Sequence, residues 1–171
     1  MSFLELAKAR YSCRKYSAKA VEPEKIETVL AAAAAAPTGC NNQPQRILLV
    51  DDPQVLAKIR ECTPFQFGAP VTFVLCYDKD ACWCNDKGEG IGPIDTTIVM
   101  THMMLQAAEL GLGTCIVGYY DKDALIKALN IPSNLDPVLL LPMGYPADGT
   151  RPSQMHDKRV PASGFVFRNH F

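Results

Sequence analysis

The chain has 171 residues, of which 48% are hydrophobic and 20% are charged, and its formal net charge at pH 7 is −1. This length suits one domain with a substantial core. A net charge so close to zero gives no electrostatic reason to expect nucleic acid or an anionic membrane as a partner.

Helix caps and the spacing of apolar residues predict helices and strands that alternate along the chain. The expected helices are a short one from Ser2 to Ala9, one from Pro23 to Ala36, a short one opened by Asp52-Pro53, a long one from Gly92 to Leu110, and one capped by Asp121. The expected strands are 46–50, 71–77, a buried strand that follows Gly111, and 138–143. By itself this alternation predicts an α/β domain with a parallel sheet.

The expected helix at 92–110 is apolar around most of its circumference. Its clearly polar residues are confined to a narrow stripe of His102, Gln106 and Glu109. A helix of this kind is buried in a core or forms part of a subunit interface. It is too short, and too often interrupted by polar residues, to span a membrane.

Two further segments carry little apolar pattern. Residues 79–92 form a polar loop with Trp83 and three glycines, which makes this loop a candidate mobile lid. The tail from Ala147 is polar and interrupted by prolines, with one isolated apolar patch at 165–167. Because the tail has little core of its own, we expect it to pack on another surface, such as a partner subunit.

The seven cysteines occur in a chain whose N-terminus lacks the pattern of a signal peptide, which favours a cytoplasmic protein with reduced thiols. Cys82 and Cys84 are separated by one residue, whereas metal-binding and redox pairs usually have two intervening residues. No histidine lies near them in the sequence. A metal site is therefore not expected, and no arrangement of serine, histidine and acid suggests a hydrolase.

Arg10, Ser12 and Arg14 recur at every second position of the sequence. In an extended segment this spacing places all three on one side, and in a helix the two arginines still share a face. Two guanidinium groups and a hydroxyl on one side suit a phosphate dianion, because arginine offers permanently charged, bidentate donors. A solvated polar turn after the first helix would show the same spacing, so the pattern alone leaves both interpretations open.

Two glycine-containing segments are candidates for contact with a flat ligand. In the loop 37–44, Asn41, Asn42 and Gln43 carry amide groups that can recognise the polar edge of a planar heterocycle. In 112–118, glycines would let the backbone approach such a ring closely, although their spacing is not that of a dinucleotide fingerprint. Ordinary turn formation is the alternative for both segments.

Taken together and in this order, four segments resemble motifs of the FMN-dependent nitroreductase family. Residues 10–16 are similar to the family's Arg-x-Ser-x-Arg/Lys segment, and residues 36–44 are similar to its Pro-Ser-x-x-Asn-x-Gln-Pro loop. Residues 108–118 are similar to its Ala-x-x-Leu-Gly-Leu-Gly-Thr/Ser-x-x-x-Gly turn. Residues 141–146 are similar to its Leu-Pro-x-Gly-Tyr-Pro segment. The resemblance implies an α+β fold, with a mixed, largely antiparallel sheet flanked by helices and the long central helix at a dimer interface. It also implies a single FMN-binding domain over 1–171, with 147–171 as an extended C-terminal arm.

The same resemblance implies that the functional residues bind FMN and that no side chain acts as a catalytic acid or base. The residues carried over from the family motifs are Arg10, Ser12, Arg14, Pro37, Thr38, Gly39, Asn41, Gln43, Ile116, Val117, Gly118, and Lys158 or Arg159. The basic residues and Ser12 would hold the phosphate, and Asn41 and Gln43 would reach the polar edge of the flavin. The turn 37–39 would come from the partner chain, and the backbone at 116–118 would line the ring near N5.

The implied function is that of an FMN-dependent oxidoreductase. NADH or NADPH would deliver a hydride at flavin N5, and a small electrophilic acceptor, nitroaromatic or quinone-like, would then take the electrons in a ping-pong cycle. The implied assembly is a homodimer with FMN at the subunit interface. Two other classes stay open: a flavin-binding sensor or carrier without turnover, and a thiol or metal module built on Cys82 and Cys84.

Overall fold

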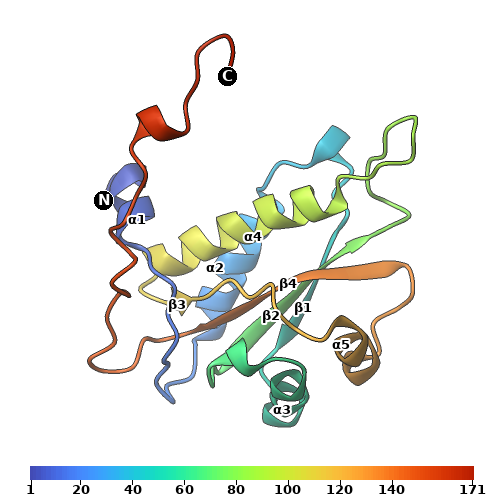
Figure 1. Ribbon diagram of the computed structural model, residues 1–171. Coiled ribbons are helices and arrows are strands. Elements are labelled where there is room, and N and C mark those ends of the chain that lie inside the picture. Colours follow the sequence, from blue (N-terminus) through green and yellow to red (C-terminus); the bar gives the residue numbers. More distant parts are fainter.

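A four-stranded antiparallel sheet forms the centre of the computed structural model, which describes residues 1–171 (Figure 1). The strand order is β1-β2-β4-β3, with β1 at Gln45–Val50, β2 at Val71–Asp78, β3 at Gly113–Thr114 and β4 at Leu135–Gly144. The α-helices are α1 at Phe3–Ala9, α2 at Pro23–Ala34, α3 at Pro53–Cys62, α4 at Gly92–Glu109 and α5 at Lys122–Leu129. Short 3-10 turns lie at Gly39–Asn41 (η1), Pro64–Gln66 (η2) and Ala162–Gly164 (η3). The structure confirms the α+β fold class.

All neighbouring strands of the sheet run antiparallel, so the parallel sheet predicted from the alternation of elements is wrong. The register pairs Val50, the last residue of β1, with Thr72 near the start of β2. The chain therefore leaves β1, forms α3 and re-enters the sheet at the same end, as in a wide hairpin. Alternation of helices and strands does not fix the path of such connections. Parallel pairing occurs at an isolated bridge between Ser12, which lies outside the named strands, and Thr114 of β3.

Helices cover both faces of the sheet (Figure 1). Phe73 and Leu75 of β2 belong to a core that includes residues of α2 and α4. Val74, between them, belongs to a second core that includes residues of α3 and α5. Successive strand residues point to opposite faces, and because both faces are covered, the whole run 71–76 is buried.

Helix α4 lies within the first core, as its apolar circumference predicts. Val99, Met103 and Ala107 are completely buried. Gly92, the first residue of the helix, has no room for a side chain because the ring of Tyr77 lies against it. Neither α4 nor any other helix has the length and apolar character needed to cross a lipid bilayer.

The helix caps predicted from local sequence are confirmed. Ser2 and Glu5 form a reciprocal capping box at the start of α1. The side chains of Asp52 and Asp121 accept hydrogen bonds from backbone N–H groups in the first turns of α3 and α5. These caps hold the helix termini without help from distant residues, which is why the sequence predicts them well.

The strand expected after Gly111 is much shorter than predicted, because β3 ends after two residues. Cys115, the next residue, still donates its N–H to the carbonyl of Pro142 over 3.3 Å. Pro142 has no N–H to donate in return, so the regular ladder stops at this position. The segment 115–118 therefore continues along the edge of the sheet with one further pairing, an isolated antiparallel bridge between Val117 and Leu140, and its Ile116 side chain is exposed.

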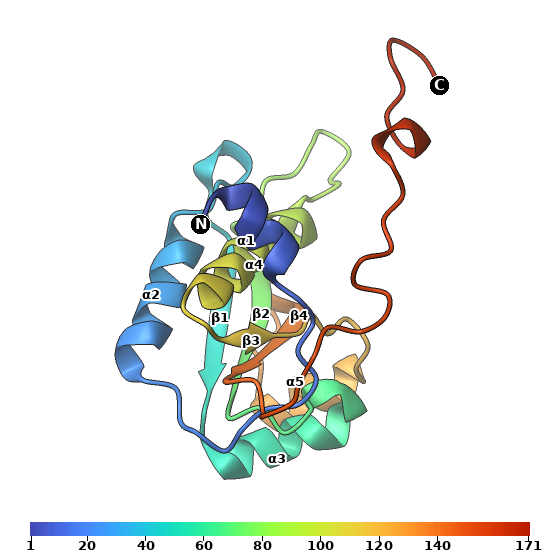
Figure 2. The ribbon, with the colours of Figure 1, turned by 90° about the vertical axis from the view of Figure 1, so that its left-hand side faces the viewer.

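Residues 147–171 form an arm whose first part runs beside the N-terminal segment and whose end extends away from the helices and the sheet (Figure 2). The only helical turn in this segment is η3. The apolar side chains of Phe165, Val166 and Phe167 are 64%, 60% and 57% exposed. This arm thus presents apolar surface that the chain itself does not cover.

Candidate functional site

Arg10, Ser12 and Arg14 line one hollow together with Arg159 from the C-terminal arm. The other residues that line it are Tyr11, Ser153, Met155 and His156. No carboxylate lines this hollow. Three guanidinium groups and two serine hydroxyls therefore converge without a competing negative charge, an arrangement that suits an oxyanion such as a phosphate. Lys158, the alternative basic residue of the arm, does not line it.

The segment that carries these arginines is extended, so the alternation expected for a strand places them on one side. The backbone N–H of Cys13 donates to the carbonyl of Thr114 over 2.8 Å, which ties the segment to β3. The hydroxyl of Tyr16 donates toward the carbonyls of Cys13 and Pro142, at 2.9 and 3.2 Å. Burial raises the pKa of Tyr16, so this hydroxyl keeps its proton and remains a donor. The buried Cys13 side chain anchors the opposite side of the segment.

His156 attaches the C-terminal arm beside this hollow. Its Nε2 lies 3.0 Å from the carbonyl oxygen of Lys8, and its ring meets the ring of Tyr11 edge-on. These contacts hold the arm next to α1 and bring Arg159 toward Arg10. His156 and Ser153 are not among the predicted site residues, because nothing in the local sequence indicates that the arm folds back onto residues near position 10.

A second hollow adjoins the first at Arg14. It is lined by Arg14, Phe65, Phe67 and, from the segment after β3, by Cys115, Ile116, Val117, Gly118 and Tyr119. The ring of Phe65 lies 5.8 Å from that of Phe67 and 5.9 Å from that of Tyr119. This hollow is mainly apolar and aromatic, so it can accept a flat ring. Burial raises the pKa of the Cys115 thiol, and Arg14 nearby partly opposes this shift.

The sequence motifs predict residues 116–118 but give no sign of the aromatic side chains beside them. Phe65 and Phe67 lie in and after η2, about fifty residues earlier in the chain. In the sequence they resemble core residues, but Phe65 is 40% exposed in the structure. An exposed aromatic cluster of this kind is a sign of a binding surface.

The loop 37–44 has an unusual backbone. Cys40, Asn41 and Gln43 have φ angles of 49°, 56° and 50°, in the left-handed region that residues other than glycine seldom adopt. Strain of this kind persists where the surrounding structure enforces it, most often at functional sites. The buried carboxylate of Asp95 contributes, since its Oδ1 accepts a hydrogen bond of 2.9 Å from the N–H of Gly39. The loop thus presents Asn41 and Gln43 as exposed amide side chains.

The structure does not bring this loop to the basic hollow within one chain. The hydrogen bond between Gly39 and Asp95 fixes the loop at the N-terminal end of α4. Arg10 lies at the opposite end of α4, where it lines a depression together with Ala108 and Gly111. Figure 1 shows α1, which directly precedes Arg10, at that end of α4. At about 1.5 Å per residue, α4 separates its two ends by roughly 27 Å. One chain therefore carries two half-sites: the basic and aromatic hollows at one end, and the loop 37–44 at the other.

Comparison with known proteins defines the class to which this fold and site belong. The structure superposes on a nitroreductase family protein from Clostridium difficile 630, with 41% identity, full coverage of both chains and a TM-score of 0.94. It also superposes on an FMN-dependent nitroreductase from Clostridium difficile R20291, with 26% identity, 99% and 100% coverage, and a TM-score of 0.83. The protein is an oxidoreductase of the nitroreductase type.

The sequence comparisons name the family. The model of the nitroreductase family matches residues 7–63 and 62–145. A protein of Methanothermobacter thermautotrophicus, named as an NADH dehydrogenase/NAD(P)H nitroreductase, is 31% identical over 169 residues, which cover 91% of this chain and 86% of that protein. The chain belongs to the nitroreductase family.

Proposed function

We propose that the protein is an FMN-dependent oxidoreductase in which NADH or NADPH, and then a small nitroaromatic or quinone-like acceptor, react in turn at flavin N5 in a ping-pong cycle. The observation that carries this proposal is the junction of the basic hollow with the aromatic hollow at Arg14. FMN combines the two parts that these hollows suit, a phosphate dianion and a flat ring. The FMN dependence named for the structural relative from Clostridium difficile R20291 supports the same cofactor.

The residues of this chain have defined roles in the proposal. Arg10, Ser12, Arg14 and Arg159 bind the phosphate through charge-assisted hydrogen bonds. The segment 115–119 orients the flavin ring, and the aromatic side chains beside this segment exclude water from one edge of the ring. When bound, FMN supplies the hydride chemistry, so the protein needs no acidic or basic side chain for catalysis. Its contribution is binding, orientation and shielding.

The proposed assembly is a cytoplasmic homodimer with FMN at the interface. Each FMN would contact the two hollows of one subunit and the loop 37–44 of the partner subunit, including the turn 37–39 and the amides of Asn41 and Gln43. The separation of these half-sites along α4 supports this arrangement. The exposed Ile94 of α4 and the apolar patch 165–167 of the arm are surfaces that a partner subunit would cover.

A shared site predicts that two defective variants restore each other. Arg10→Ala/Arg14→Ala and Asn41→Ala/Gln43→Ala should each bind FMN weakly as pure proteins. After unfolding and refolding as an equal mixture, half of the dimers are mixed, and each mixed dimer has one site with both halves intact. About one quarter of all sites should then bind FMN tightly, as measured by fluorescence titration. Each variant refolded alone is the control, and a mixture no better than the controls would contradict the shared site.

The absorbance spectrum of the purified protein tests the proposed activity directly. The spectrum is recorded after addition of FMN and removal of the excess, before and after anaerobic NADH or NADPH. We expect flavin bands that bleach on addition of the reductant and return when a quinone is added. Flavin bands that do not bleach would favour the sensor or carrier, and a protein that takes up no FMN would contradict the proposal.

A further inference from the structure

The segment 79–91 contains a short hairpin that the proposed flavin chemistry does not use. Cys84 pairs with Gly90 in an antiparallel bridge, and the N–H of Ile91 donates to the carbonyl of Trp83 over 3.1 Å. Residues two apart in an extended chain point to the same side, so Cys82 and Cys84 share one side of this hairpin. Their Sγ atoms lie 3.8 Å apart, which is van der Waals contact.

The hairpin packs closely around this pair of thiols. A Cβ atom at Gly90 would lie 3.1 Å from both sulfur atoms, so with a side chain there each sulfur would have to give way by a few tenths of an ångström. At the tip, the Oδ1 of Asn85 accepts hydrogen bonds from the backbone N–H groups of Lys87 and Glu89, each at 2.9 Å. The side chain of Asn85 fixes the turn, and the absence of a side chain at position 90 leaves room for both sulfurs.

These two thiols also differ from most other cysteines in accessibility. Four of the remaining five are buried: Cys13, Cys62, Cys76 and Cys115. Burial raises the pKa of each of these four thiols, which favours their protonated form. Desolvation and the neighbouring Cys84 also raise the pKa of the Cys82 thiol, so accessibility is what distinguishes the pair. Cys84 is exposed, Cys82 is partly exposed, and the third accessible thiol is Cys40 in the loop 37–44.

We propose that Cys82 and Cys84 form a thiol–disulfide exchange site for low-molecular-weight disulfides. The thiolate of Cys84, the more exposed of the two, attacks one sulfur of the small disulfide, whose S–S bond breaks and releases one thiolate. Cys82 then loses its proton to solvent and attacks the Cys84 sulfur, which forms the Cys82–Cys84 bond and releases the second thiolate. The protein loses two electrons and two protons, and the small disulfide is reduced to two thiols.

The geometry favours closure of this bond over other chemistry at the same place. The sulfurs need to move only from 3.8 Å to a bonding distance of about 2.0 Å. A metal centre would need further ligands, and no group of three or more histidine, cysteine or acidic side chains is arranged to hold an ion.

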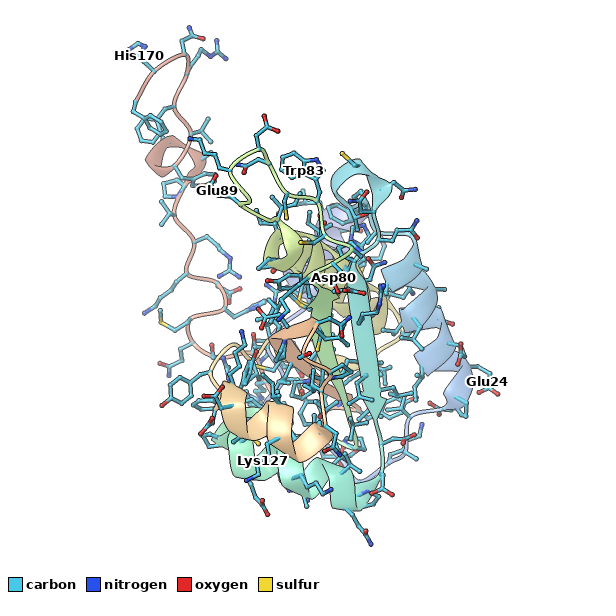
Figure 3. The ribbon with its side chains drawn as sticks, turned by 90° about the vertical axis from the view of Figure 1, so that its right-hand side faces the viewer. Glu24, Asp80, Trp83, Glu89, Lys127 and His170 are labelled. Carbon is cyan, nitrogen blue, oxygen red and sulfur yellow. The ribbon has the colours of Figure 1, made fainter.

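The exchange site lies next to the loop 37–44. A side chain at Gly39 would collide with Ile91 and approach the Cβ of Trp83 to 3.4 Å, so the hairpin packs directly on this loop. Figure 3 shows Trp83 on the part of the hairpin beside that loop. Trp83 is the only tryptophan in the chain and lies between the two cysteines, so its fluorescence provides a local signal for bond closure.

The test uses the full chain with Cys40→Ser in every variant, which removes the other accessible thiol. The reduced protein is treated with 2-hydroxyethyl disulfide and followed by intact mass and by Trp83 fluorescence. We expect a loss of about 2 Da with no persistent adduct, and peptide mapping should locate the new bond between Cys82 and Cys84. The variant that also carries Cys82→Ser should instead accumulate a stable adduct at Cys84.

Gly90→Ala gives a second, independent comparison. The added methyl group makes each sulfur give way by a few tenths of an ångström, so closure should slow modestly. The same change combined with Cys82→Ser should leave the rate of the first attack on the small disulfide unchanged. Three results would overturn the proposal: persistent adducts in the protein that retains both cysteines, no reaction at all, or a new bond that involves another cysteine.

Discussion

Replacing both Arg10 and Arg14 with alanine is expected to lower the affinity for FMN by at least about 100-fold. A hydrogen bond to a charged group contributes about 1.5–3 kcal/mol, so each single variant should lose roughly 10- to 150-fold. Both guanidinium groups line the same hollow, so they act on one phosphate and their effects need not add. Fluorescence titration of FMN into the protein freed of flavin measures the dissociation constant.

Two comparisons separate this effect from a general loss of positive charge. Arg60 lies in the last turn of α3 and lines neither hollow, so Arg60→Ala should bind FMN normally. In the arm, Arg159→Ala should weaken binding, whereas Lys158→Ala should have little effect because Lys158 does not line the hollow. Unchanged affinity in both single variants, Arg10→Ala and Arg14→Ala, would contradict the phosphate assignment.

The parts of the site that local sequence predicts are those whose geometry is set within a few residues. Arg10, Ser12 and Arg14 share a side because their segment is extended, and this follows from spacing alone. The aromatic side chain of Phe65 and the imidazole of His156 reach the hollows only through the fold. Phe65 precedes β2 and His156 lies in the arm, so no periodicity connects either of them with Arg14.

The fold shows the same division between local and distant causes. The caps at Ser2, Asp52 and Asp121 depend on residues within three positions, and the sequence predicts them correctly. The early end of β3 depends on Pro142, which lies opposite Cys115 but far from it in the sequence. The direction of β2 relative to β1 depends on the end of the sheet at which the chain re-enters after α3. The spacing of apolar residues does not determine this end. For this reason, the family resemblance predicted a mixed, largely antiparallel sheet, close to the antiparallel sheet observed, and the alternation of elements did not.

Gly113→Ala is expected to destabilise the protein by about 1–3 kcal/mol and to weaken FMN binding at the same time. A Cβ at this position would lie 2.6 Å from the Cβ and 2.8 Å from the Sγ of Cys13, and Cys13 is completely buried. The backbone must therefore move apart where the N–H of Cys13 donates to Thr114. This contact joins the segment that carries Arg10 and Arg14 to the start of the segment 115–118, so its loss should separate the two hollows. Chemical denaturation and FMN titration measure the two effects.

Gly118→Ala is the matched comparison for stability. A Cβ there would meet only Leu139, at 3.5 Å, which is an ordinary contact, so the free energy of unfolding should change by less than about 0.5 kcal/mol. If Gly113→Ala proves as stable as Gly118→Ala, the close packing of β3 against Cys13 does not constrain the fold. If Gly113→Ala is destabilised but binds FMN with unchanged affinity, the bond between Cys13 and Thr114 does not align the hollows. The proposed site requires both effects together, because the phosphate and the ring of one ligand must fit two hollows that the bond between Cys13 and Thr114 helps to hold in register.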